Sequence, residues 1–413
     1  MQNLNDASPV KKFTGYEKFV IAILAFTVFT VVLDFMVLAP LGAQLIRLMN
    51  ISPAQFGLVV SAYAFSAGAS GLLAAGFADR FDRKKLLLFF YSGFIIGTLL
   101  CALANSYHLL LFARIFTGLF GGVISSISFA IITDLFEVEK RGRVMGFVQM
   151  SFGVSQVLGI PIGLYLAHLY DWHAPFFAIV ILSILIFFVI YKWMKPVNEH
   201  LKVQNDKNAF VHMYHTLSNK DYIKGFTAMA LISIGGFLLM PLSSAYLVNN
   251  IQISEAQLPI LFMFAGVASL ITGPLVGRWA DVYGKLRLFT IGSLITIIMV
   301  AIYTNMNPWP LYIVTLINAL LFVGVSSRMI SGSALITQLP ELKDRGAFMG
   351  VNSSLQQISG GLGSLIAGLI VIKNADGTLE HFNYLGYLTI LMLIICMYMM
   401  RMIQNIIAKR SNK

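Results

Sequence analysis

Residues 51–55 read ISPAQ, and residues 253–257 read ISEAQ, which is an offset of 202 residues. Two further pairs of matches keep the same order and nearly the same offset: Ala78-Asp79 with Ala280-Asp281, and Arg141-Gly142…Met145-Gly146 with Arg345-Gly346…Met349-Gly350. One match could arise by chance, but three in order indicate a duplicated unit. The sequence therefore predicts two related halves.

The composition predicts that these halves lie in a membrane. Of the 413 residues, 58% are hydrophobic and 11% are charged, whereas soluble domains carry about 25% charged residues. This composition excludes a soluble globular enzyme and a disordered chain. Twelve apolar runs are each long enough for a membrane helix of ~20 residues. They lie near 19–41, 55–78, 86–106, 108–133, 144–168, 174–194, 225–248, 256–277, 286–304, 310–338, 347–372 and 383–403.

The expected fold is an all-α membrane protein with twelve transmembrane helices in two pseudo-symmetric six-helix bundles. The bundles are expected at 1–194 and 225–413, and the polar residues 195–224 between them are expected to form a cytoplasmic linker. Three linker histidines, His200, His212 and His215, could bind a metal ion, but a solvated loop is the favoured interpretation.

The net charge of +11 is distributed unevenly. All but four of the 29 Lys and Arg residues fall in segments on one side of the predicted bilayer. Arg47 and Lys373 fall on the other side, and Arg114 and Arg328 fall inside predicted spans. Because positively charged loops stay in the cytoplasm, both termini are expected there. The charge thus indicates topology and contact with an anionic leaflet rather than nucleic-acid binding.

No cofactor, metal or catalytic site is expected. Cys101 and Cys396 lie in apolar runs without metal-ligand spacing. Neither an HExxH motif nor a G-x-x-x-x-G-K-[ST] motif occurs, so ATP drive within this chain is not expected. A membrane enzyme would need a convergent nucleophile and base, which the spans do not offer. A receptor that binds a ligand without moving it is a further alternative.

The loop after the second predicted span reads GFADRFDRK at 76–84. Asp79 ends a helix there, and basic side chains crowd the next turn. This loop resembles the G-x-L-A-D-R-x-G-R-K signature of the major facilitator superfamily, with Ala75 and Asp82 in place of the usual glycines. A degenerate second copy at 277–285 contains Asp281. The resemblance covers essentially the whole chain and implies two parallel six-helix halves around a midplane site.

The same resemblance implies a cytoplasmic gate held closed by a charge relay. Its expected members are listed in chain order: Asp79, Arg80, Arg83, Asp134, Arg141 and, in the second copy, Asp281. Asp79→Asn would then loosen the gate and lower transport without preventing folding. The alternative is that this basic loop only follows the distribution of charge across the membrane.

The fifth predicted span contains GVSQVLGIPIG at 153–163. Gly153, Gly159, Pro161 and Gly163 permit close packing and a kink. The run resembles the glycine/proline motif of the superfamily's antiporters, in the drug- and sugar-efflux branch, although Ile160 separates Gly159 from the proline. Ordinary helix packing is the alternative.

Asp34 is the only acid well inside a predicted span, and Arg114 lies at a similar depth in the fourth span. A charge at the bilayer centre costs about 2.5–3.5 kcal/mol even on the lenient scale, so such residues are functional candidates. An apolar environment favours the protonated carboxyl group, and a nearby cation favours the ionised one. We expect Asp34, with Arg114, to carry the coupling proton; a purely structural ion pair is the alternative.

The substrate site is expected among polar residues of the spans: Gln149, Gln156, Arg328, Asn352 and Gln356. Arg328 could bind a polar or anionic substrate group, although a structural or snorkelling role is favoured. The 32 Phe and 19 Met residues would suit a flexible apolar cavity for lipophilic compounds. These residues also commonly fill membrane helices without binding a substrate.

The expected function is proton-coupled export of small hydrophobic compounds by alternating access. The alternatives are an exporter of a sugar, metabolite or lipid on the same scaffold, and a proton symporter for uptake. The expected partners are a small-molecule substrate, protons and the lipid bilayer. From the compact size and the efflux resemblance we expect the cell (inner) membrane. The protein is expected to be a monomer.

Overall fold

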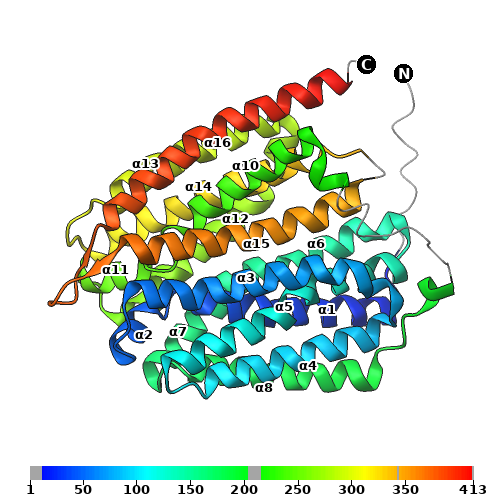
Figure 1. Ribbon diagram of the computed structural model, residues 1–413, viewed down its shortest axis with the longest axis horizontal. Helices are drawn as coiled ribbons and strands as arrows, with labels where there is room; N and C mark the ends of the chain where they lie inside the picture. Colours follow the sequence, from blue (N-terminus) through cyan, green and yellow to red (C-terminus); the bar gives the residue numbers. More distant parts are fainter. Residues whose placement is uncertain (1–11, 203–214, 342–343, 412–413) are drawn as a thin grey trace.

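The computed structural model of the protein describes residues 12–202, 215–341 and 344–411. These residues form a bundle of helices that run side by side along the long axis of the molecule (Figure 1). The first half contains α1 (Gly15–Val37), α2 (Gly42–Leu48), α3 (Pro53–Phe77), η1 (Ala78–Arg80), α4 (Arg83–Ala102), α5 (Tyr107–Leu135), α6 (Val138–Val154), η2 (Ser155–Gly159), α7 (Ile160–Leu169) and α8 (Ala174–Trp193). The second half, after η3 (Glu199–Lys202), contains α10 (Lys220–Phe237), α11 (Ser243–Asn249), η4 (Glu255–Gln257), α12 (Leu258–Tyr283), α13 (Lys285–Tyr303), α14 (Leu311–Ile336), α15 (Arg345–Ile370), the short hairpin β1 (Ile372–Lys373) and β2 (Leu379–Glu380), and α16 (Phe382–Ser411).

Ten helical segments in the described residues are long and apolar enough to cross a membrane. The other two crossings are α10 with α11, and α15, which run alongside the ten (Figure 1). α15 is 26 residues long but rich in Gly, Ser and Gln, and α10 carries three charges in its first five residues. The predicted twelve-helix fold in two bundles is therefore confirmed.

Several helices extend beyond their predicted boundaries. α10 begins at Lys220, inside the expected linker 195–224, α6 begins at Val138 rather than 144, α12 ends at Tyr283 rather than 277, and α16 continues to Ser411, well past 403. Residues 203–214 of that linker, including His212, lie outside the described residues.

The ISPAQ repeat marks equivalent helix starts in the two halves. At Ser52 the hydroxyl accepts from the Gln55 N–H (3.2 Å), and Gln55 Oε1 accepts from the Ser52 N–H (2.9 Å). Ser254 and Gln257 form the same reciprocal capping box before α12. Each box satisfies backbone donors that the first helical turn leaves without partners. The repeat is therefore a start signal for the second crossing of each half.

Prolines interrupt three crossings. Pro40 lies in the turn between α1 and α2, and Pro241 lies in the matching turn between α10 and α11. The π-helical segment η2 ends two residues before Pro161, which is the second residue of α7. Because proline lacks a backbone N–H and its ring crowds the preceding turn, it breaks or widens a helix in this way.

The two halves pack mainly through α3 against α15, and through η2 and α7 against α12. Small residues allow this close approach: a Cβ atom at Gly57 would lie 2.7 Å from the Ser364 carbonyl oxygen. Small residues therefore let the backbones of α3 and α15 come into contact across the two halves.

The halves are tied together at the end that carries the β1–β2 hairpin (the hairpin end). They diverge toward the end where α1 begins and α16 ends (the terminal end; Figure 1). At the hairpin end the Ser244 hydroxyl donates to the Ala39 carbonyl (3.0 Å), and Glu255 pairs with Arg47 (2.7 Å) and accepts from Gln44 (3.1 Å). At the terminal end, Lys140 pairs with Glu17 of its own half (2.8 Å).

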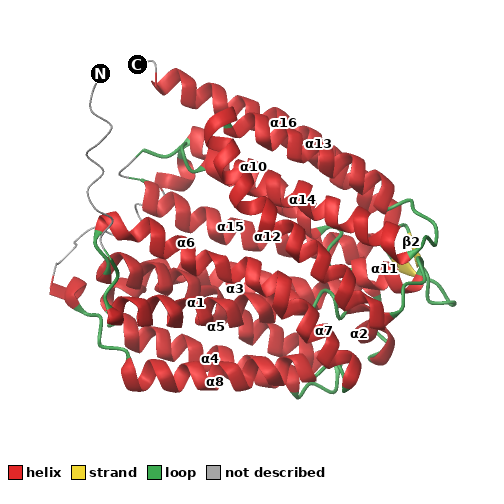
Figure 2. Ribbon diagram, turned by 180° about the vertical axis from the view of Figure 1, so that it is seen from behind, coloured by secondary structure: helices red, strands yellow, loops and turns green. Residues whose placement is uncertain are grey.

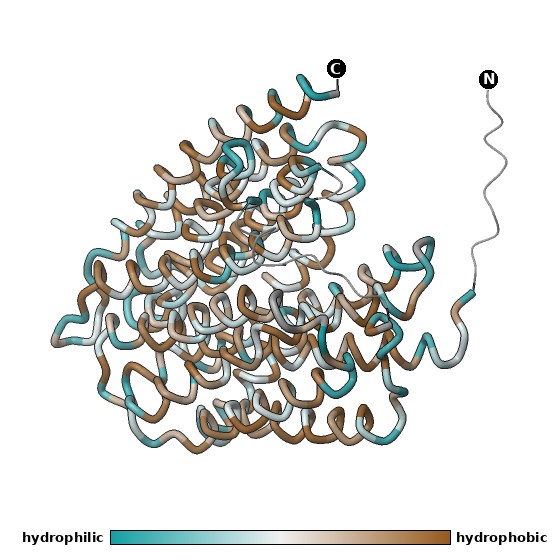
Figure 3. The backbone as a smooth tube through the Cα atoms, turned by 45° about the vertical axis from the view of Figure 1, so that its right-hand side comes forward, coloured by the Kyte–Doolittle hydropathy of each residue, from teal (hydrophilic) through white to brown (hydrophobic). Residues whose placement is uncertain are grey.

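The outer surface suits a bilayer. Large apolar side chains of the outer helix α8, such as Ile181, Leu185 and Phe188, are exposed. Figure 2 shows the helices and the loops that connect them. Hydrophobic residues run along the helices, whereas hydrophilic residues gather toward the helix ends and connections (Figure 3). In water these exposed side chains would be a liability, but in lipid they need no cover.

Candidate functional site

Asp34 and Arg114 form a fully buried ion pair in the first half. Arg114 Nη1 lies 2.8 Å from Asp34 Oδ2, and both side chains have 0% exposure. Nη1 also donates to the Asp34 carbonyl oxygen (3.4 Å), and the Thr98 hydroxyl donates to Asp34 Oδ1 (3.1 Å). The guanidinium carbon lies 4.5 Å from the centre of the Tyr63 ring. The site therefore joins α1, α3, α4 and α5 around one carboxylate.

Glycines on α5 bring these helices close enough to enclose the pair. A Cβ atom at Gly118 would lie 2.5 Å from the Tyr63 carbonyl oxygen and 2.1 Å from Ser66 Oγ. This spacing places the Tyr63 ring against Arg114, where the negative face of the ring attracts the cation. The sequence indicated a similar depth for Asp34 and Arg114, and the structure brings the two side chains together.

The pair can exist in two charge states. The ionised form keeps one negative and one positive charge in contact away from water, which is tolerable only while both are present. Protonation of Asp34 would cancel the attraction and leave the Arg114 charge uncompensated. This arrangement can therefore couple a bound proton to movement of the helices that carry the two residues.

A second ionic cluster lies at the terminal end of the first half. Arg83, at the start of α4, is 5% exposed; its Nε donates to Asp134 Oδ2 (2.9 Å), and its Nη1 donates to the Ala78 carbonyl (2.9 Å). The side chain of Asp79 lies outside the described residues. Two of the expected gate residues, Arg83 and Asp134, are thus in contact.

The other expected gate residues are placed differently. Arg141 lies in α6 and donates to the Thr133 and Phe136 carbonyls (2.6 and 2.9 Å) at the end of α5 instead of to a carboxylate of the expected relay. Arg80 is exposed, and Asp281 is 76% exposed with Lys285 at 3.9 Å. The contacts of Arg141 place a cation at the C-terminal end of α5, where the helix dipole favours positive charge.

His200 is part of the same cluster, although the sequence placed it in a solvated loop. Its Nδ1 lies 3.3 Å from Asp134 Oδ2, and its Nε2 lies 3.2 Å from the Phe81 carbonyl oxygen. The Arg83 N–H donates to the Val197 carbonyl (2.9 Å), which fixes the start of the linker against this loop. No sequence motif marks His200, because the contact depends on how the linker folds back.

The glycine/proline run lies beside the buried ion pair. A Cβ atom at Gly159 would lie 2.6 Å from Leu33 Cδ1, and one at Gly163 would lie 2.8 Å from Val37 Cγ2. Leu33 is the neighbour of Asp34 in the chain. These glycines therefore hold the fifth crossing against α1 next to the acid.

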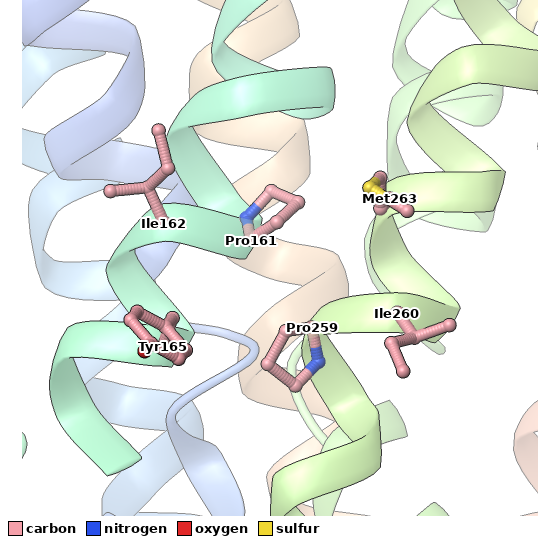
Figure 4. A pocket seen from close by; sticks show the side chains of 6 residues that line it. All are labelled: Pro161, Ile162, Tyr165, Pro259, Ile260 and Met263. Carbon is pink, nitrogen blue, oxygen red and sulfur yellow. The ribbon is translucent and has the colours of Figure 1, made fainter. Parts of the chain in front are cut away.

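The other face of this run meets the second half. A Cβ atom at Gly153 would lie 2.9 Å from Leu270 Cδ1 of α12. Farther along, α7 and α12 border an apolar groove of about 240 Å³ (Figure 4). The groove is lined by Pro161, Ile162, Tyr165, Pro259, Ile260 and Met263.

No hydrogen bond among the described residues joins any two of the five expected substrate residues. Gln149 is exposed, Gln156 and Gln356 are half-buried, and Asn352 and Arg328 are buried. The Asn352 Oδ1 atom is buried without a hydrogen-bond partner among the described residues. Among the described residues, α15 therefore keeps one buried hydrogen-bond acceptor that no other group uses.

The sequence matches the pattern of the Major Facilitator Superfamily over residues 24–221 and 225–410. Multidrug resistance protein 3 of Bacillus subtilis (strain 168) is 34% identical over 152 residues, which is 37% of this chain and only 30% of that relative's length. A probable sugar efflux transporter of Helicobacter pylori (strain ATCC 700392 / 26695) is 23% identical over 368 residues, 87% of this chain and 90% of the relative.

Solved structures share the fold at low sequence identity. A bacterial homologue of the human lysosomal transporter Spinster, described as inward-facing and unoccupied, has a TM-score of 0.77 at 16% identity, covering 96% of this chain and 99% of that one. The nucleoside transporter NupG has a TM-score of 0.71 at 14% identity, covering 94% and 99%. Because the family pattern covers both halves, the chain belongs to the major facilitator superfamily of membrane transporters.

Proposed function

We propose that the protein is a proton-coupled exporter of small hydrophobic compounds that works by alternating access. The observation that carries this proposal is the Asp34–Arg114 pair, which is buried at 2.8 Å with 0% exposure. A buried carboxylate with one cation partner can accept a proton and thereby break the pair. Multidrug resistance protein 3, a relative over part of the chain, supports the choice of hydrophobic compounds.

The closed hairpin end supports alternating access. Glu255 and Ser244 of the second half bond to α2 and to the turn before it, while Arg83–Asp134 and Arg410–Asp221 (2.7 Å) at the terminal end each stay within one half. The distribution of Lys and Arg supports a cytoplasmic location for the terminal end. We therefore assign this structure to the inward-facing state. In this assignment the protein lies in the inner membrane of the cell, and both termini lie in the cytoplasm.

Export of a sugar or another metabolite on the same scaffold is the second candidate. It is favoured by the similarity to the probable sugar efflux transporter, which covers 90% of that relative.

Purified protein in liposomes with a trapped pH-sensitive dye would test the proposal. Cationic, neutral and anionic lipophilic compounds and a set of sugars would be added in turn across an imposed pH gradient. A pH change evoked by a lipophilic compound, and absent from protein-free liposomes, is the expected result. A response only to sugars would replace hydrophobic compounds with sugars as the substrate class. Substrate flux without any proton movement would overturn the proposed coupling to protons.

Arg47→Ala is expected to destabilise the inward-facing state because it removes the ion pair with Glu255 across the hairpin end. Arg47 is 63% exposed, so solvent screening limits the contribution to about 0.2–1 kcal/mol. The population of outward-facing molecules should rise by up to about fivefold, since 1.4 kcal/mol corresponds to tenfold. Spin labels on α2 and α11 would measure this as a longer distance between the halves.

Lys373→Ala is the matched control, because Lys373 is a basic residue of the same end that lies in β1. It should leave the distance distribution unchanged. Equal distributions in Arg47→Ala and the wild type would show that the Arg47–Glu255 pair does not hold this end closed.

A further inference from the structure

Arg328 is a buried cation without an acidic partner among the described residues. It lies in α14 with 0% exposure, and its one hydrogen bond in this part of the chain runs from Nη1 to the Ile232 carbonyl oxygen of α10 (3.3 Å). Its Nε and Nη2 atoms are buried without hydrogen-bond partners. A guanidinium in this condition has lost its hydration and gained no compensating charge.

The same chain contains a buried arginine whose charge is compensated. Arg114 also leaves Nε and Nη2 without hydrogen bonds, but Asp34 balances its charge at 2.8 Å and the Tyr63 ring covers its face. No described carboxylate lies in the same way against Arg328, so the described surroundings of the two arginines differ in net charge. An intramembrane charge that no described residue neutralises indicates a functional site.

The second half lacks an acid at the position that matches Asp34. The turns Leu38-Ala39-Pro40-Leu41 and Leu239-Met240-Pro241-Leu242 align the sequences of the two halves. In this alignment Gly235 occupies the position that corresponds to Asp34. The next residue, Gly236, lies beside Arg328, since a Cβ atom there would be 3.4 Å from Nη2. No side chain of Gly236 therefore covers this edge of the guanidinium.

The helices packed around Arg328 do not supply the missing charge from their described residues. On α10, Asp221 is engaged with Arg410 and Lys224 near the start of the helix. On α16, Cys396 is the titratable group next to Arg328, and its thiol donates to the Ala228 carbonyl (3.7 Å). Among the residues that the structure describes, Arg328 consequently has no carboxylate to bind.

We propose that Arg328 binds an acidic group of the transported compound, a carboxylate or a phosphate, through Nε and Nη2. These two atoms form one edge of the guanidinium plane, and two parallel N–H groups match the two oxygens of such a group. The inference rests on the proposed export function and narrows its substrate class to amphipathic anions. Arg328 thus contributes charge recognition from the second half, while Asp34 and Arg114 handle the proton in the first.

Thermal unfolding of the purified protein in detergent tests this proposal without requiring transport. The probes are benzoate, 2-naphthoate and phenyl phosphate, with the neutral amides benzamide and 2-naphthamide as matches and sodium chloride as an inorganic anion. We expect at least one organic anion to raise the Tm of the wild type while its amide does not. Arg328→Met should abolish that rise, and Arg328→Lys should retain part of it.

The ligand-free Tm values distinguish binding from a structural role. Arg328→Met removes an uncompensated charge and should raise the Tm. Arg114→Met leaves the Asp34 carboxylate without its cation and should lower the Tm. A lower Tm in Arg328→Met, an unchanged anion response in that variant, or no response of the wild type to any organic anion would overturn the proposal. An effect produced fully by chloride would assign the site to an inorganic ion. Failure of the liposome assay alone would overturn export and leave these binding results intact.

Discussion

Asp34→Asn is expected to abolish proton movement driven by substrate while the protein still exchanges substrate across the membrane. The amide has the shape of a protonated carboxyl group but cannot release or bind a proton. Because Asp34 is the acid paired with Arg114 inside the first half, no described residue replaces it in that contact. In dye-loaded liposomes the pH signal should fall to background, whereas exchange of labelled substrate in the absence of a gradient should continue.

Asp376→Asn is the matched control, since Asp376 is an exposed acid in the hairpin turn that bonds to Thr378 (2.6 Å). It should leave the pH signal intact. Asp34→Asn also leaves Arg114 without an anion, so its Tm and its abundance in the membrane must be measured alongside. Asp34→Glu keeps a titratable group and should restore part of the signal. A full pH signal in Asp34→Asn would remove this residue from the coupling mechanism.

Local sequence patterns account for most of the fold. The apolar runs gave the crossings, and the repeat at Ser52 and Ser254 corresponds to capping boxes whose hydrogen bonds depend only on near neighbours. The two crossings with weak apolar signals, α10 and α15, are those that contain charged or small polar residues. Both were still found among the twelve apolar runs, and the repeat at 345–350 also marks the start of α15.

The site was predictable where intramembrane charge is rare and unpredictable where it depends on long-range folding. Asp34 and Arg114 stand out because charges in apolar runs are costly. The contact of His200 with Asp134 joins residues 66 positions apart across a linker, and no local pattern specifies it. Likewise, the sequence assigns Arg141 to the terminal end. It does not predict that Arg141 donates its hydrogen bonds to the Thr133 and Phe136 carbonyls.

Arg114→Met is expected to destabilise the protein strongly, because removing one member of a buried ion pair leaves the other charge uncompensated. Such losses are about 3–5 kcal/mol, and the contact with the Tyr63 ring adds to them. Thermal unfolding in detergent should show a Tm several degrees below that of the wild type. Arg401→Met is the control, since Arg401 is an exposed arginine of α16 and should change the Tm little.

The destabilisation should depend on pH in a defined direction. Without Arg114, the folded state favours the protonated Asp34, whereas an unfolded chain exposes an ionised carboxylate near neutral pH. The folded state then binds more protons than the unfolded state, so the stability of Arg114→Met should fall as pH rises. Unfolding measured across the range from about pH 5 to 8 would show the gap to the wild type widening toward the alkaline end.

A double-mutant cycle separates the pair from the rest of its surroundings. The variant Asp34→Asn/Arg114→Met contains neither charge, so the uncompensated carboxylate of the single variant is absent. Its Tm should therefore lie above that of Arg114→Met, and its stability should lose the added dependence on pH. Additive losses in the double variant would mean that the two side chains contribute independently. In that case the 2.8 Å contact would not be the source of their stability, and a mechanism in which protonation breaks the pair would lose its basis.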